Sequence, residues 1–212
     1  GGQNWGFPPL HPDRLLDSQY EYVIASLRNH MRYAGVLRID HVMGLHRLYW
    51  IPNGIGAKEG VYVKYRPEHY YAILSLESHR NKTIIIGEDL GTVEPSVREQ
   101  MRRHRIQRMV VQPFPNHGSP TPVPHAVASL NTHDMPMFAA LWTGKDIADR
   151  KDLGWHTDEE VEQEHRERKQ VCEETARFLH EQGWLTNYPT STYPASSETI
   201  RDIYQACLRY LA

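Results

Sequence analysis

The sequence predicts an α/β fold built on a parallel sheet. Short apolar runs alternate with helical patterns along the chain, as in βαβ units. Residues 83–90 are apolar and β-branched, which is typical of a strand buried on both faces of a parallel sheet. A closed eight-stranded barrel and an open doubly wound sheet both fit. A full barrel needs roughly 250 residues, so about four strands in 212 residues would form an incomplete one.

The elements follow from hydrophobic periodicity and from turn residues. Strands are predicted at residues 36–40, 83–90, 108–114 and, from a weaker pattern, 126–134. Helices are predicted at residues 17–34, 67–80, 94–104, 158–181 and from about 197 onward. Asp17 is the expected N-cap of the first helix and Gly35 its stop. The many charges of residues 158–181 are expected to form a solvated face.

The composition is that of an ordinary soluble globular protein, with 40% apolar and 24% charged residues. The net charge of −2 gives no basic field for nucleic acid. No apolar stretch is long enough to span a membrane. Two isolated cysteines, Cys172 and Cys207, are typical of free thiols in a reducing compartment. We therefore expect a cytoplasmic protein that binds neither nucleic acid nor membrane.

Both ends of the chain indicate a piece of a longer protein. The chain starts without Met, and it ends within a helical pattern that has no glycine cap.

Polar residues gather where the predicted strands end. Asp40 and His41 follow the first strand, Glu88 and Asp89 the second, and an adjacent His133–Asp134 pair the last. The carboxyl ends of parallel strands lie on one side of a sheet, where α/β proteins build their sites. Arg38, two residues before Asp40, points to the same face and would keep that carboxyl ionised.

Three readings of these carboxylates compete. A single Asp at a strand end is usually a cap or a loop residue, but here acidic residues recur at spacings of 48 and 46 residues. A metal site is less favoured, because no H-E-x-x-H motif or cysteine spacing accompanies them. Carboxylates with separate roles suit glycoside chemistry, in which one attacks the anomeric carbon and another protonates the leaving oxygen.

Aromatic residues offer candidate platforms for sugar rings, namely Trp5, Tyr49, Trp50, Tyr62 and Trp142. For all of them except Trp5, ordinary packing is the favoured interpretation.

Four motifs resemble those of the 4-α-glucanotransferases (amylomaltases or disproportionating enzymes) of glycoside hydrolase family 77. They are "GQNWGFPP" (2–9), "LRIDHVMGLHRLYWIP" (37–52), "IIGEDLGTV" (85–93) and "LNTHDMP" (130–136). The resemblance covers nearly the whole chain and keeps the family's order and spacing. It implies a (β/α)8 barrel, of which this chain would hold roughly strands four to seven, without the first strands and the last. Residues 1–212 would then be one partial catalytic barrel domain, and we expect the isolated piece to be inactive.

The resemblance also implies roles for individual residues. Asp40 would be the nucleophile, Glu88 the acid/base, and Asp134 the stabiliser of the oxocarbenium-like sugar. Contacts to substrate would come from Gln3, Trp5, Arg38, His41 and His133.

The implied reaction moves α-1,4-glucan segments between maltooligosaccharides, or between glucans derived from starch and glycogen. No metal or organic cofactor is implied. Three alternatives stay open: an α-glucan hydrolase with the same carboxylates, a carbohydrate-binding fragment without catalysis, and, least favoured, a metal-dependent hydrolase.

Overall fold

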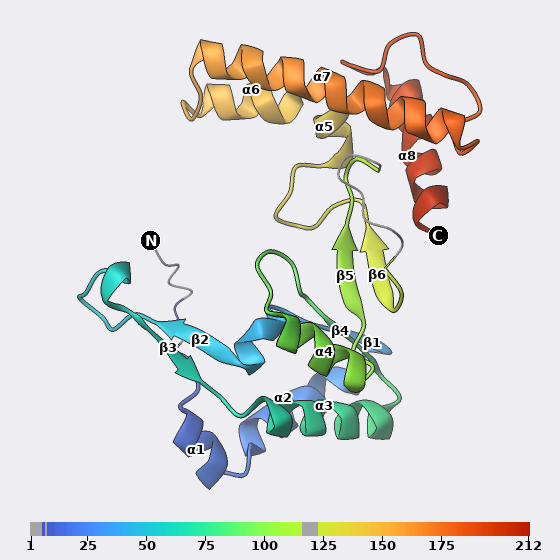
Figure 1. Cartoon of the computed structure of the whole chain (residues 1–212). Coiled ribbons are helices and arrows are strands. Elements are labelled where there is room, and N and C mark those ends of the chain that lie inside the picture. The colour runs from blue at the N-terminus through green and yellow to red at the C-terminus, as the bar shows by residue number, and fades with distance from the viewer. Residues whose placement is uncertain (1–5, 7, 116–122) are drawn as a thin grey trace. The chain divides into compact units, whose positions relative to one another are not determined.

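The computed structural model describes residue 6, residues 8–115 and residues 123–212. The chain forms two compact units. The first holds residues 1–109 and 125–127, and the second holds residues 110–124 and 128–212. The first unit contains α1 (Pro12–Asp17), α2 (Glu21–Met31), β1 (Val36–Ile39), η1 (Val42–Leu45), β2 (Arg47–Trp50), η2 (Ala57–Glu59), β3 (Val61–Lys64), α3 (Pro67–Asn81), β4 (Ile84–Gly87) and α4 (Pro95–Arg103). Two strands, β5 (Arg108–Val111) and β6 (Ala126–Ser129), have residues in both units, and the second unit contains α5 (Phe138–Thr143), α6 (Lys145–Asp152), α7 (Asp158–Glu181) and α8 (Ser197–Leu211) (Figure 1).

The four predicted strands are present and pair as neighbours in chain order, but each is shorter than predicted, and β6 ends at Ser129, five residues before Asp134 (134 − 129). β1 and β4 are parallel, with Val36 opposite Ile84. β4 continues to the start of β5 through a parallel bridge between Ile86 and Gln107. β5 pairs with β6, and their backbone hydrogen bonds advance together along both strands, from Arg108 N to His125 O and from Gln112 N to Ser129 O. A parallel arrangement explains this common direction, because antiparallel partners would advance oppositely.

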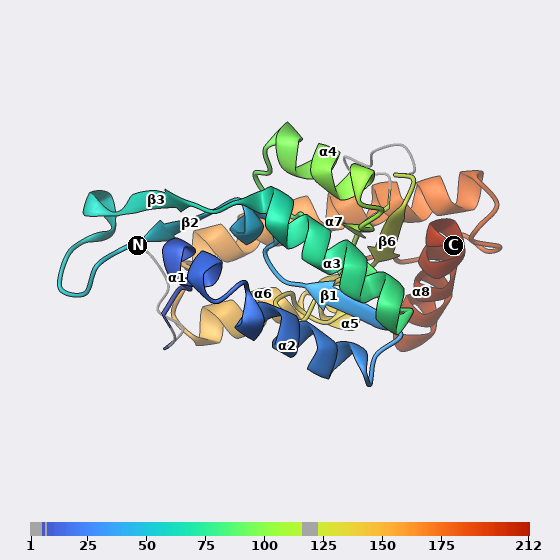
Figure 2. The same cartoon turned by 90° about the horizontal axis from the view of Figure 1, so that it is seen from below.

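Helices cover one face of the β1–β4 pair. Helices α2 and α3 lie along one side of β1 (Figure 2). Leu37 and Ile39 on β1 pack against a core formed with residues of α2, α3 and α4, whose buried members are Met31, Val42, Tyr71, Leu74, Ile85, Val97, Met101 and Ile106. Proline at the first position of α3 and α4 suits their start, because that position has no helical N–H partner to lose. Both helices confirm the sequence prediction to within one residue at each end.

The opposite face of these strands is partly open within the part of the chain that the structure describes. Val36 and Ile84 expose 52% and 55% of their surface, whereas Ile86 on the same face is buried. Val36 and Ile84 also border a hollow of about 820 Å³ that residues of α3, Lys82 and Arg105 help to line. Arg38 points to this open face as well, because it is two residues along β1 from Val36.

The predicted helix at residues 17–34 is wrong in its boundaries. Asp17 ends α1 rather than capping α2, and α2 ends at Met31, four residues before Gly35. The break comes at Gln19 and Tyr20, which have φ angles of 51° and 59°. Tyr20 is buried there, with its ring edge-on to His69 and Tyr70 of α3. A long-range aromatic contact therefore overrides the local helical pattern.

The antiparallel hairpin of β2 and β3 was missed from the sequence. Its strands pair Arg47 with Lys64 and Tyr49 with Tyr62. Tyr49 and Tyr62 stack edge to face, and the Arg47 guanidinium lies 4.2 Å from the Tyr62 ring centre. The connection between these strands runs from Ile51 to Gly60. It is longer than the short turns from which a hairpin can be predicted in a sequence.

The second unit packs around a buried tryptophan. Trp142 is fully buried against Phe114 and Phe138, with helices α7 and α8 completing the core. α7 confirms the predicted long helix and starts with a capping box between Thr157 and Glu160. Its charges are only partly solvated, since Arg168 is nearly buried and pairs with Asp146 at 3.0 Å. Among the described residues, no helix is long and apolar enough to cross a membrane.

Gly87 provides a test of the packing behind the candidate site. A Cβ atom there would lie 2.9 Å from both Met101 Cε and Val42 Cγ2. We expect Gly87→Ala to lower the free energy of unfolding by about 1–3 kcal/mol through overpacking. Gly35→Ala is the matched control, because a Cβ at Gly35 meets nothing within 4 Å. Equal melting temperatures for the two variants would contradict this packing.

Candidate active site

Asp40 and Glu88 stand at equivalent positions just beyond two adjacent strands. The β1–β4 register pairs residues 48 positions apart, from Val36 with Ile84 to Ile39 with Gly87. Asp40 and Glu88 are separated by the same offset, and each stands one residue beyond the last paired position of its strand.

A local distortion at His41 brings a backbone N–H to the Glu88 carboxylate. Glu88 N still donates to Ile39 O at 2.9 Å, as a parallel ladder requires. His41 then adopts a left-handed conformation with φ of 45°, and Val42 N, rather than His41 N, donates to the Glu88 carbonyl. The freed His41 N donates to Glu88 Oε2 at 2.8 Å.

The second oxygen of the Glu88 carboxylate is also held by backbone. Leu90 N donates to Oε1 at 2.7 Å. Each carboxylate oxygen has two lone pairs, so both oxygens retain a site for a proton or a substrate hydroxyl. The side chain is therefore oriented by main-chain groups on both sides and lies half-buried at the strand end.

Arg38 contacts Asp40, as their common face predicts. The Arg38 Nη2 to Asp40 Oδ1 distance is 2.7 Å, and 75% of the Asp40 side chain is exposed. Arg38 Nε in turn donates to Met109 Sδ at 3.3 Å. Asp40 thus presents an accessible carboxylate beside a permanent cation, which is suited to attack on an electrophilic carbon.

Asp89 points away from Glu88 into the protein. Its side chain is fully buried and pairs with Arg98 of α4 at 3.1 Å and Arg108 of β5 at 2.7 Å. Met109 N donates to the other oxygen at 3.0 Å. The sequence suggested no partner for Asp89, because Arg98 and Arg108 lie 9 and 19 residues away. Strand alternation was the one available signal that adjacent acidic residues face opposite sides.

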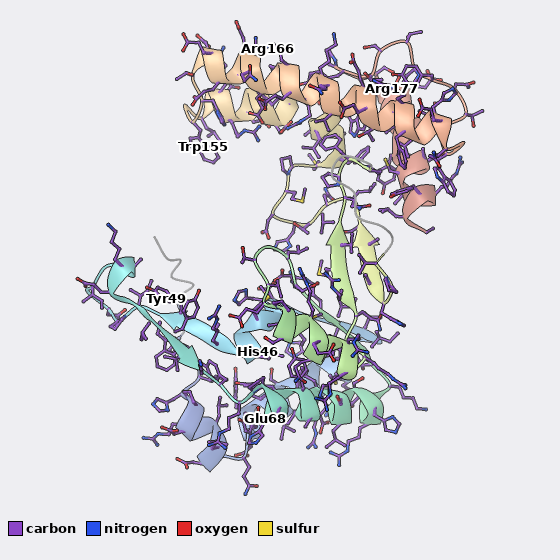
Figure 3. All side chains as sticks on the ribbon, viewed as in Figure 1. His46, Tyr49, Glu68, Trp155, Arg166 and Arg177 are labelled. Carbon is purple, nitrogen blue, oxygen red and sulfur yellow. The ribbon has the colours of Figure 1, made fainter. Side chains whose placement is uncertain are left out.

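Two half-buried histidines flank the buried Tyr71 of α3. His46, at the base of the β2–β3 hairpin (Figure 3), lies 3.1 Å from the Tyr71 hydroxyl, and the Tyr71 ring stacks on His104. Burial lowers the pKa of both histidines, and it raises the pKa of Tyr71 to about 12. These three side chains are therefore neutral at physiological pH.

Of the other predicted site residues, two belong to the second unit and two fall outside the described residues. Asp134 and His133 belong to the second unit, where His133 Nε2 lies 3.1 Å from Asp134 Oδ1 and both side chains are exposed. Their convergence with Asp40 and Glu88 stays a prediction. Gln3 and Trp5 fall outside the described residues.

The aromatic candidates divide by exposure. Trp142 is core, as expected. Tyr49 on β2 (Figure 3) and Tyr62 on β3 are about half exposed and contact each other. Among the described residues, no group of three His, Cys, Asp or Glu side chains could hold a metal ion.

The chain is an α/β protein in which Asp40 and Glu88 follow two adjacent parallel strands at their carboxyl ends, where α/β proteins build their sites. The family model described as 4-alpha-glucanotransferase, glycoside hydrolase family 77, matches residues 1–212, and the chain belongs to this family.

Individual relatives agree with this membership. A 4-alpha-glucanotransferase of Haemophilus influenzae is 38% identical over 87% of this chain, and one of Mycobacterium bovis is 37% identical over 72%. The crystal structure of amylomaltase from Corynebacterium glutamicum superposes with a TM-score of 0.78 at 33% identity, over 87% of this chain. Amylomaltase from Streptococcus agalactiae in complex with acarbose shares the fold with a TM-score of 0.57 at 17% identity, over 99% of this chain and 47% of its own. The chain spans only about a quarter of the first relatives, namely 27%, 22% and 27% of the first three named here.

Proposed function

We propose that the longer protein containing this chain is a 4-α-glucanotransferase. It moves α-1,4-glucan segments between maltooligosaccharides, or between glucans derived from starch and glycogen. The observation that carries the proposal is the placement of Asp40 and Glu88 one residue beyond the paired positions of β1 and β4, with Asp40 exposed beside Arg38 and Glu88 held by two backbone N–H groups. Family membership supports the choice of substrate.

The proposed reaction is a double displacement with retention at the anomeric carbon. Asp40 attacks the anomeric carbon and forms a glycosyl ester, while Glu88 gives its proton to the departing 4-oxygen. Glu88 then takes the proton from the 4-hydroxyl of an incoming glucan, whose oxygen attacks the anomeric carbon as the bond to Asp40 breaks. Glu88 returns to its acid form, so neither a metal nor an organic cofactor is needed.

The remaining site residues are proposed to position the sugar. Asp134 would stabilise the oxocarbenium-like transition state through hydroxyls next to the anomeric carbon. His41 and His133 would contact sugar hydroxyls, and Gln3 and Trp5 would line the cleft. Arg38 would keep Asp40 oriented, which its 2.7 Å ion pair supports.

We propose that residues 1–212 form part of a (β/α)8 barrel, roughly its strands four to seven. Two observations support this: the parallel neighbours follow chain order, and the strand face opposite the helices is open at Val36 and Ile84. In a barrel that face would be filled by side chains of the other strands. A cytoplasmic location is part of the proposal, and the two buried free cysteines support it.

The experiment incubates the full-length protein with maltotriose and analyses the products. We expect glucose together with longer maltooligosaccharides, with no net gain of reducing ends, because each transfer makes one bond for each bond broken. A net gain of reducing ends would indicate the hydrolase alternative. No reaction at all would indicate a carbohydrate-binding protein, and loss of activity with a chelator would indicate the metal-dependent alternative.

A further inference from the structure

Asp89 follows Glu88 in the chain, yet the reaction proposed above gives it no role. Its carboxylate is fully buried and joins three elements. Oδ2 accepts from Arg98 Nε at 3.1 Å and from Arg108 Nε at 2.7 Å, and Oδ1 accepts from Met109 N at 3.0 Å. One side chain thus ties the end of β4 to α4 and to the start of β5.

The Asp89 carboxylate and its three hydrogen-bond donors, here called the anchor, act on the backbone that holds Glu88. Leu90 N, which donates to Glu88 Oε1 at 2.7 Å, belongs to the peptide that joins Asp89 to Leu90. The direction of that N–H depends on the backbone conformation of Asp89. The Asp89 side chain restrains this backbone through its bonds to Arg98, Arg108 and Met109. Arg98 Nη2 also reaches the carbonyl oxygen of that same peptide at 3.5 Å. The peptide between Asp89 and Leu90 is therefore held at its carbonyl oxygen by Arg98, while its N–H orients the Glu88 carboxylate.

We propose that Asp89 is a positioning residue for Glu88, the proposed acid/base, and this inference rests on the proposed function. Glu88 needs a defined orientation toward the glycosidic oxygen, and a misplacement of about 1 Å can cost about 100-fold in rate. The Asp89 carboxylate supplies that orientation through the Leu90 N–H. An asparagine at position 89 would lose the charge and present an amide N–H₂ to guanidinium donors, so the anchor would be broken at nearly constant volume.

Two substrates with different leaving groups distinguish a role of Asp89 in positioning Glu88 from a role in stabilising the fold alone. Release of fluoride from α-maltotriosyl fluoride needs little proton donation, and azide as the acceptor needs no base. Transfer between maltotriose molecules needs both roles of Glu88. We expect Asp89→Asn in the full-length protein to lower kcat for maltotriose about 10- to 100-fold, with KM within about twofold, and to leave fluoride release with azide nearly unchanged.

Glu77→Gln is the matched control. Glu77 on α3 is another buried carboxylate held by two arginines, Arg28 at 2.8 Å and Arg80 at 3.1 Å, and it has no contact with Glu88 in the structure. We expect this variant to melt at a lower temperature and to keep the wild-type ratio of the two reactions. If Asp89→Asn fails to fold, Arg98→Gln removes one guanidinium from the anchor. We then expect a smaller loss of kcat for maltotriose, again with fluoride release nearly unchanged.

Equal loss of both reactions, or unchanged kcat for maltotriose in the folded variants, would overturn the inference. These outcomes are distinguishable from failure of the proposed function, in which the wild-type protein itself would not disproportionate maltotriose.

Discussion

We expect asparagine in place of Asp40, the proposed nucleophile, to abolish the proposed glucan transfer of the full-length protein while the fold persists. The amide cannot form the glycosyl ester, so we expect kcat to fall by about 10⁴-fold or more, as when other covalent enzymes lose their nucleophile. The structural cost is small, because Asp40 is 75% exposed. Its pair with Arg38 is a surface ion pair, a kind worth about 0–1 kcal/mol.

Maltotriose disproportionation and thermal unfolding of the same samples check this prediction. Asp13→Asn is the matched control, since Asp13 is another exposed aspartate, 83% accessible, outside the candidate site. The control should keep full activity, and both variants should melt close to the wild-type temperature. A role for Asp40 as nucleophile would be excluded if its variant kept more than about 1% of the wild-type kcat, a loss far below that expected for a nucleophile.

Alanine at position 88 has the second largest expected effect. General acid–base catalysis contributes about 10²- to 10⁴-fold, and we expect a loss of that size with maltotriose. The first step with α-maltotriosyl fluoride should survive, because fluoride leaves without a proton. Azide can then occupy the space vacated by the Glu88 side chain and attack the glycosyl ester on Asp40.

The configuration of the azide product distinguishes the two carboxylates. Glu88→Ala should yield the α-glycosyl azide, because two displacements retain configuration. In an Asp40→Ala variant, azide would replace the nucleophile in a single displacement and yield the β-glycosyl azide. NMR of the purified products measures the outcome. The opposite pair of configurations would mean that the roles of Asp40 and Glu88 are exchanged.

Much of the first unit could be predicted from local sequence. The β-branched runs mark β1 and β4, and the prolines at residues 67 and 95 mark the starts of α3 and α4. The hairpin of β2 and β3 and the break at Tyr20 could not be predicted in this way. Both depend on aromatic contacts between residues far apart in the chain, such as Tyr20 with Tyr70.

The candidate site divides in the same manner. By itself the sequence determined that carboxylates follow the strands and that Arg38 shares a face with Asp40, because a strand's side chains alternate with a period of two. Only the tertiary structure decided that Asp40 and Glu88 follow directly after paired positions of β1 and β4, since the register of two parallel strands is set by packing across the sheet. It also decided that Glu88 lies half-buried under two backbone N–H groups while Asp89 is buried between Arg98 and Arg108. Those arginines come from α4 and β5, and a buried carboxylate is stable only where the folded chain brings such cations to it.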